Sequence, residues 1–154
     1  MSDRGFLLDV NVLLALLWPA HEFHNQVRTW FREHGSRRWA TCPLTQNGFV
    51  RLASNPAITR DALSIPESLS LLKTNLAHPG HSFWPDDLDL VGALSRSNAR
   101  LQGYRQVTDA YLLGLAIHHK GQVVTLDGGL ATLLPPAVRD TDWILDLSTA
   151  KRRR

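Results

Sequence analysis

Short apolar runs alternate along the chain with longer segments in which apolar residues recur every three or four positions. The short runs are typical of buried β-strands, and the periodic segments are typical of helices that pack one face on a core. Their alternation predicts parallel strands connected by helices, and therefore an α/β fold. The expected strands span residues 5–9, 38–42, 81–85, 122–127 and 142–147, and the expected helices span residues 11–17, 21–34, 43–54, 65–76, 87–98 and 107–120.

Some of the expected helices carry start and stop signals. Ser64 with Glu67 three residues later resembles a capping box. Asp86 is expected to cap the helix that follows it, and Thr108 to cap the last helix. That last helix is apolar on nearly every side and ends at Gly121, so we expect it at the centre of the core.

Composition and charge fit one ordinary globular domain. Of the 154 residues, 44% are apolar and 20% are charged, which excludes a disordered chain. The 17 Lys and Arg include four in the terminal residues 151–154, and the remaining 13 nearly balance the 14 Asp and Glu. We therefore expect a domain over residues 1–150 and a basic tail over residues 151–154, which a solvated terminus explains better than phosphate binding.

Targeting signals are missing from the sequence. No apolar run approaches the roughly 20 residues that a membrane helix requires. The N-terminus lacks the basic start and the small-residue cleavage site of a signal peptide. The single cysteine, Cys42, cannot form an internal disulfide. A cytoplasmic protein with no membrane contact is expected.

Two aspartates directly follow apolar runs. Asp9 comes after the first run, and Asp127 comes after the run that begins at Val123. The carboxyl ends of parallel strands form one edge of a sheet, where ligands bind, so both carboxylates are expected to face that edge. Thr125 lies two residues before Asp127 on the same strand face, and is expected in the wall of this crevice.

A third carboxylate, Asp109, lies in the first turn of the last helix, where the helix dipole favours an acid. Because this helix immediately precedes the strand at Val123, its start is expected away from the carboxyl edge unless the connection folds back. Spacing alone leaves both arrangements open.

Three carboxylates drawn together repel one another, and a divalent cation is the cheapest way to keep them ionised. Oxygen ligands favour Mg²⁺ or Mn²⁺ over zinc. Such a cluster points to phosphoryl chemistry, although each aspartate taken alone is more simply interpreted as a helix cap or a turn residue. Two other aspartate chemistries fit less well: receiver domains need an acid pair after the first strand, and dehalogenase-type phosphatases need an aspartate where Asn11 stands.

Four motifs, in order and spacing, resemble the PIN-domain ribonucleases, and among them the VapC toxins of bacterial toxin–antitoxin pairs. The resemblance covers nearly the whole chain and is strongest in the motifs "LLDVNVLLALL", "CPLTQNGFVRLASNP", "VTDAYLLGLAIHHKG" and "VVTLD". The resemblance implies a three-layer fold with a small, mainly parallel sheet flanked by helices. It also implies that the start of the last helix lies beside the two strand ends.

The resemblance implies a chemistry and partners as well. Asp9, Asp109 and Asp127 are then the acids that bind Mg²⁺ or Mn²⁺ and catalyse metal-dependent cleavage of RNA. The protein is then a homodimer, and a cognate VapB-type antitoxin inhibits it by inserting its C-terminal segment into the active-site groove.

One residue departs from the family pattern. Family members often carry a glutamate where this chain has Gln46, which can coordinate through its oxygen but adds no charge. We therefore expect one tightly bound ion, with a second arriving together with the RNA phosphate. The alternative is a PIN-fold module that binds RNA or a protein, with cleavage weakened or absent because of Gln46.

Three polar residues near these motifs each allow two interpretations. Asn11 either hydrogen-bonds the Asp9 carboxylate or caps the first helix. Thr45 either orients a ligand or bonds back to its own helix. Arg51 either reaches an RNA phosphate or lies on the surface.

The histidines and the remaining acids suggest no second site. His118 and His119 end the last helix, but no third ligand follows at a suitable spacing, so we interpret them as helix-terminal polar residues. The acidic run of residues 86–89 is explained by a helix N-terminus.

Overall fold

The computed structural model describes residues 4–97, 101–133 and 143–148 of the chain. Within these ranges the strands form one sheet of order β3-β2-β1-β4-β5, in which every neighbouring pair is parallel. The expected basic tail, residues 151–154, lies outside the described residues. The strands are β1 (Phe6–Leu8), β2 (Trp39–Thr41), β3 (His81–Phe83), β4 (Gln122–Thr125) and β5 (Ile144–Asp146).

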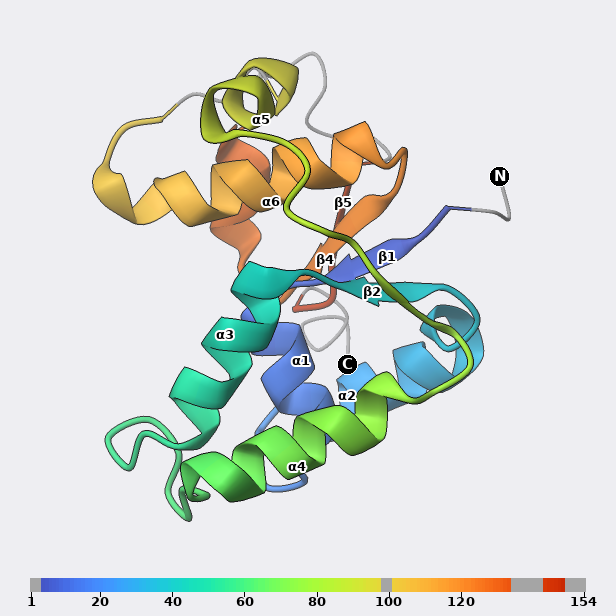
Figure 1. Ribbon diagram of the computed structural model, residues 1–154, viewed down its shortest axis with the longest axis vertical. Coiled ribbons are helices and arrows are strands. Elements are labelled where there is room, and N and C mark those ends of the chain that lie inside the picture. Colours follow the sequence, from blue (N-terminus) through green and yellow to red (C-terminus); the bar gives the residue numbers. More distant parts are fainter. Residues whose placement is uncertain (1–3, 98–100, 134–142, 149–154) are drawn as a thin grey trace.

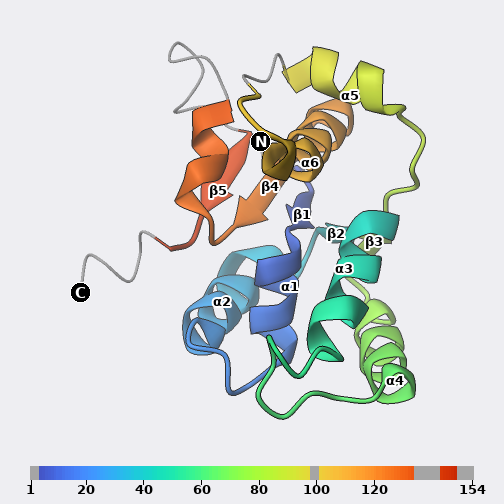
Figure 2. The same ribbon diagram turned by 90° about the vertical axis from the view of Figure 1, so that its left-hand side faces the viewer.

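Helices cover both faces of this sheet, which confirms the predicted three-layer α/β architecture (Figures 1 and 2). The first four helices lie on one face, and α5 and α6 lie on the other. No described helix is both long enough and apolar enough to cross a membrane. The helices are α1 (Val10–Leu17), α2 (His24–Trp30, continued by a π-helical turn over Phe31–Gly35), α3 (Pro43–Ala53), α4 (Ile65–Leu76), α5 (Leu90–Ser97) and α6 (Val107–His118).

Alternation along the central strands divides the core in two. Leu7 and Val123 belong to the cluster that contains the α6 side chains, whereas their neighbours Leu8 and Val124 belong to the cluster that contains the α1 side chains. All four are fully buried, because successive strand residues point to opposite faces and both faces are covered.

The direction of α6 decides where the site can form. The helix leads directly into β4 and returns across the sheet against the strand direction, so its start lies at the carboxyl edge and its end at the opposite edge. In Figure 1 the start of α6 lies at the left, the side toward which β1 points. Of the two arrangements that spacing left open, the structure shows the one that the family resemblance implies.

Local sequence signals predicted the start of α4 well and the two ends of α6 poorly. The capping box is present, since the Glu67 amide donates to Ser64 Oγ at 3.1 Å and the Ser64 amide donates to Glu67 Oε1 at 3.2 Å. Thr108 does not cap α6, because a 3₁₀ turn over Tyr104–Gln106 precedes the helix and Gln106 occupies the cap position. At the other end, the left-handed residue is Lys120, with φ of 56°, and not Gly121.

The start of α5 also differs from the prediction. The helix begins at Leu90 rather than at residue 87, and Asp89 Oδ1 accepts a hydrogen bond from the Gly92 amide at 2.7 Å. Asp86 does not cap this helix, because it accepts a hydrogen bond from the Tyr111 hydroxyl. That long-range bond leaves the segment between β3 and α5 extended over α6.

Candidate active site

Asp9 lies where β1 ends and α1 begins, and it is the residue that caps α1. Its carboxylate is 7% exposed. Oδ1 accepts from the Val10 amide at 2.7 Å, and Oδ2 accepts from the Thr125 hydroxyl at 3.0 Å. Burial raises the pKa of Asp9, the two hydrogen bonds partly offset this rise, and the charge of Asp127 adds to it. Asn11 therefore does not cap α1, and it lies exposed in the first turn.

The Thr125 hydroxyl connects two strand ends. Thr125 is fully buried at the end of β4, and its oxygen accepts from the Asp127 amide at 2.9 Å while its hydrogen is donated to Asp9. Asp127 itself is exposed, and its Oδ1 accepts from the Gly129 amide at 2.8 Å. One hydroxyl thus fixes both the buried carboxylate and the turn that carries the exposed one.

Asp109 faces these two acids from the first turn of α6, where it is half-buried. Burial, followed by the charges of Asp9 and then Asp127, raises the pKa of Asp109 from its usual 3.8 to about 6. The three acids are therefore close enough to repel one another. Their oxygens do not all lie within 4.8 Å of one another, a distance that among the described residues only Asp87, His118 and His119 meet. An oxygen-only set that carries excess negative charge fits a hard divalent cation.

Gln46 lies in α3 and takes part in a short hydrogen-bonded chain. Its Nε2 donates to Thr41 Oγ1 at 2.9 Å, and the same oxygen lies 2.7 Å from His81 Nε2. Burial lowers the pKa of His81, which leaves an uncharged ring to accept the Thr41 hydrogen. The Gln46 amide nitrogen is thus occupied, and its carbonyl oxygen is the group available to a ligand. The sequence analysis missed Thr41, although its position at the end of β2 marks it.

The two other predicted polar residues lie in α3. Thr45 is fully buried, and its hydroxyl accepts from the Cys42 amide at 3.0 Å and donates to the Cys42 carbonyl at 3.1 Å. Of its two interpretations, the bond back to its own helix is therefore the one observed. Arg51 is exposed in the last turn of the helix.

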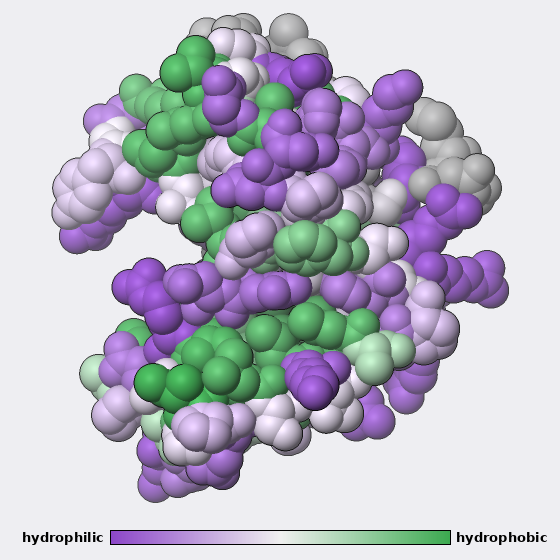
Figure 3. Space-filling model, viewed as in Figure 1, coloured by the Kyte–Doolittle hydropathy of each residue, from purple (hydrophilic) through white to green (hydrophobic). Residues whose placement is uncertain are grey.

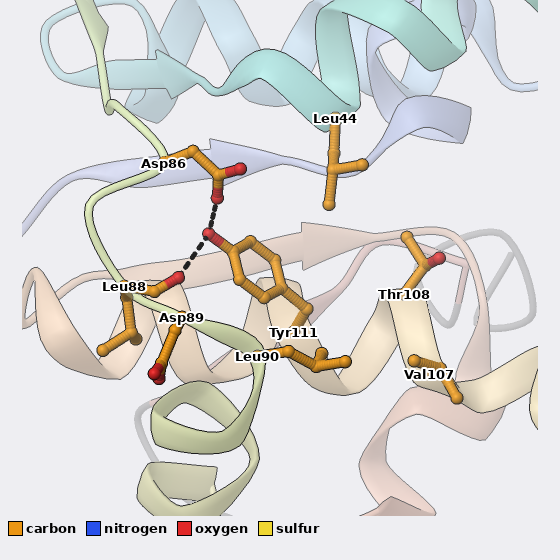
Figure 4. A pocket seen from close by; sticks show the side chains of 8 residues that line it. All are labelled: Leu44, Asp86, Leu88, Asp89, Leu90, Val107, Thr108 and Tyr111. Atoms are coloured by element: carbon orange, nitrogen blue, oxygen red, sulfur yellow. Dashed lines mark hydrogen bonds between the residues drawn. The ribbon is translucent and has the colours of Figure 1, made fainter.

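A pocket of about 350 Å³ lies between the start of α3 and the elements α5 and α6, and Thr108, the residue before Asp109, lines it. In Figure 3 it contributes to the hollow at the left of the molecule. Figure 4 shows Leu44 of α3 across from Val107 and Thr108 of α6, with Tyr111 directed at Asp86. The Tyr111 hydroxyl oxygen also lies 3.1 Å from the Leu88 carbonyl oxygen, so it contacts two residues in one wall of the pocket.

The chain matches the model of the PIN domain family over residues 6–133. It belongs to the PIN domain family. This PIN domain is 44% identical over 127 residues to Ribonuclease VapC38 of Mycobacterium tuberculosis, covering 82% of this chain and 88% of that protein. It is 41% identical over 134 residues to Ribonuclease VapC44 of the same species, covering 86% of this chain and 94% of that protein. These relatives confirm the resemblance to VapC ribonucleases that the four motifs indicated.

Solved structures share the PIN-domain architecture. PAE2754 from Pyrobaculum aerophilum superposes with a TM-score of 0.58 at 19% identity, covering 97% of this chain and 88% of that chain. DNA-bound VapBC from Salmonella typhimurium gives a TM-score of 0.57 at 14% identity, covering 94% and 98%. At these identities the likeness concerns the fold.

The sequence analysis did not single out Asp146, a further aspartate at a strand end of this PIN domain. It ends β5, where it pairs in register with Thr125 of β4. Its Oδ1 accepts from the amide and the hydroxyl of Ser148, at 2.9 and 2.6 Å. The signal that identified Asp9 and Asp127, an acid at the end of an apolar run, applies equally to this residue.

Proposed function

We propose that this PIN-domain protein is a metal-dependent endoribonuclease and the toxin of a toxin–antitoxin pair. In this proposal Asp9, Asp109 and Asp127 hold Mg²⁺, or Mn²⁺ in its place. The observation that carries it is the gathering of three carboxylates at one edge of the sheet, where burial and then the charges of Asp9 and Asp127 raise the pKa of Asp109 to about 6. The relatives named ribonucleases support RNA as the substrate.

When bound, the ion supplies a Lewis acid that activates water and offsets negative charge on the scissile phosphate. The protein's part is to hold the acids in place. The Val10 amide and the Thr125 hydroxyl orient the Asp9 carboxylate, since each binds a different oxygen. Thr125 also holds the turn of Asp127 through its amide. These contacts preorganise the ligands before RNA arrives.

We propose supporting roles for the remaining polar residues. Gln46 offers a neutral carbonyl oxygen, so we propose that one ion binds tightly and a second arrives with the RNA phosphate. Thr45 fixes the start of α3 and thereby the position of Gln46. Asn11, exposed in the first turn of α1, approaches the ligands of the ion, and Arg51 contacts an RNA phosphate.

The proposal extends to assembly and location. A VapB-type antitoxin is the proposed inhibitor, supported by the likeness to a VapBC complex. We also propose a homodimer, built from single domains of residues 1–150, that acts in the cytoplasm.

Incubation of the purified full chain with single-stranded RNA tests this function. Cleavage is expected with Mg²⁺ or Mn²⁺, and none is expected with EDTA. The alternative, a PIN module that binds RNA without cutting it because of Gln46, predicts retained RNA and no products with any of these ions. Under that alternative Gln46→Glu restores cleavage, whereas cleavage that persists in EDTA contradicts the metal-dependent mechanism.

A further inference from the structure

Two histidines and an aspartate meet at the end of α6 that lies opposite the three aspartates. His118 is the last residue of α6, His119 caps it, and Asp87 belongs to the segment between β3 and α5. His118 Nε2 lies 3.8 Å from Asp87 Oδ2, and His119 Nε2 lies 3.7 Å from Asp87 Oδ1. Each of the three residues offers one ligand atom, and these atoms all lie within 4.8 Å of one another.

Hydrogen bonding does not account for this arrangement. Both N···O distances exceed the 2.7–3.2 Å of an N–H···O bond. Among the described residues, His119 Nε2 is a buried side-chain nitrogen without a hydrogen-bond partner, and such an atom costs free energy. Its ring is held by Trp84, which stacks on it at 4.3 Å between centroids and 8° between planes. The nitrogen is therefore fixed in direction and left without a ligand.

The geometry suits a metal ion that binds nitrogen. Zinc takes imidazole nitrogen at 2.0–2.1 Å and carboxylate oxygen at 2.0–2.2 Å, which at a tetrahedral angle separates N and O by about 3.3 Å. Side-chain shifts of about half an ångström bring the observed N···O distances of 3.7 and 3.8 Å to this value. Burial also lowers the pKa of His119 and favours the neutral ring that metals require.

We propose that Asp87, His118 and His119 form a binding site for Zn²⁺, distinct from the three aspartates. Imidazole ligands favour zinc over Mg²⁺, whereas the aspartates have the opposite preference. The nine residues that separate Asp109 from His118 along α6 place the two sites about 14 Å apart along the helix axis.

Zinc at this site ties the segment before α5 to the end of α6. Asp86, the residue before Asp87, accepts from Tyr111 at the wall of the pocket beside Asp109. The ion therefore stabilises that wall without taking part in the chemistry, and the site stands whether or not the chain cuts RNA.

Calorimetric titration of Zn²⁺ into the full chain, free of any histidine tag and in excess Mg²⁺, tests the site. The Mg²⁺ keeps zinc from the three aspartates. One Zn²⁺ per chain is expected, and Asp87→Asn and His118→Gln are each expected to weaken its binding at least tenfold. His34→Gln is the matched control, because His34 is exposed beside Glu33 and makes the same kind of distant ion pair, at 3.9 Å. Its affinity for zinc is expected to equal that of the parent.

Thermal unfolding gives a second readout, since a ligand that binds only the folded state raises its stability. Zn²⁺ is expected to raise the Tm of the parent and of His34→Gln, but not that of Asp87→Asn, whose exposed side chain tolerates the change. No zinc binding, equal binding by parent and both site variants, or displacement of zinc by Mg²⁺ would each overturn the proposal.

Discussion

The two ends of α6 present opposite chemistries on one helix. At its start, Asp109 faces Asp9 and Asp127, and burial together with the charges of these two acids raises the pKa of Asp109 to about 6. At its end, two imidazoles face a single carboxylate at 3.7 and 3.8 Å. The first group brings three like charges together, whereas the second combines one carboxylate with two imidazoles whose ligand atoms all lie within 4.8 Å of one another.

This difference shows that proximity alone does not identify a catalytic metal site. The tighter cluster is the one with histidines, yet its nitrogens suit zinc rather than Mg²⁺. The looser cluster carries the excess negative charge that a hard cation relieves. Donor chemistry, rather than compactness, is therefore the reason why we propose the metal site for RNA cleavage at the start of α6.

The largest effect is expected from removing one acid at the start of the helix. Asp109→Asn removes a charged ligand, so kcat/KM for RNA cleavage in Mg²⁺ is expected to fall by more than about 100-fold, beyond what partners outside the ligand set cost. Asp61→Asn, the same change at an exposed aspartate between α3 and α4, is expected to cleave at the parent's rate. If Asp109→Asn cleaves RNA at the parent's rate, Asp109 is not a ligand in the catalytic site, and the proposed difference between the two ends of α6 is wrong.

A smaller loss is expected at Thr125, which touches the acids without being one of them. Thr125→Val abolishes the hydroxyl that binds Asp9 and the Asp127 amide, and is expected to raise the Mg²⁺ concentration for half-maximal rate by roughly 10- to 100-fold. Thr125→Ser keeps the hydroxyl and is expected to restore the parent's value. Equal behaviour of the two variants would show that the hydroxyl does not organise the site.

Adding a negative charge beside the three aspartates is expected to strengthen their binding of Mg²⁺. Gln46→Glu supplies a fourth carboxylate next to Thr41 and is expected to tighten Mg²⁺ binding by roughly tenfold, because ligand charge sets the affinity of such sites. Asn47→Asp adds the same charge at the next, exposed position and is expected to change the affinity little. Calorimetry that finds unchanged or weaker binding for Gln46→Glu would place residue 46 outside the site.

The smallest effect is a pH dependence of stability at the acid end. The pKa of Asp109 is about 6 in the folded state and 3.8 in its unperturbed state, so the folded chain holds more protons in this window and loses stability as the pH rises through it. In EDTA, the Tm of the parent is expected to fall by a few °C relative to Asp109→Asn between pH 4 and pH 7. Saturating Mg²⁺ is expected to abolish the difference, and parallel curves in EDTA would contradict the raised pKa of Asp109.

The aspartates at the start of α6 could be predicted because the sequence signals that mark them are local. Asp9 and Asp127 each follow an apolar run, and strand-end positions in a parallel sheet converge on one edge. The capping box at Ser64 was likewise predictable, because its two residues are neighbours on one helical turn. Gln46 was identified through the family pattern, and its bond to Thr41 became visible only in three dimensions.

The meeting of Asp87 with His118 and His119 could not be predicted from the sequence, because it depends on tertiary contacts. Asp87 lies within an acidic run that fits a helix N-terminus, yet α5 begins only at Leu90 and leaves Asp87 free to reach His118 and His119. Asp86 was assigned to the same cap and instead binds Tyr111. No spacing rule connects these residues, since the fold, and not the chain, makes them neighbours.

The central claim, that Asp9, Asp109 and Asp127 share a hard divalent ion, is tested most directly by anomalous diffraction from crystals of the full chain grown with Mn²⁺. The account predicts a manganese peak bonded to oxygens of all three carboxylates. A peak found only between Asp87 and the two histidines, or ordered carboxylates with no peak between them, would contradict it.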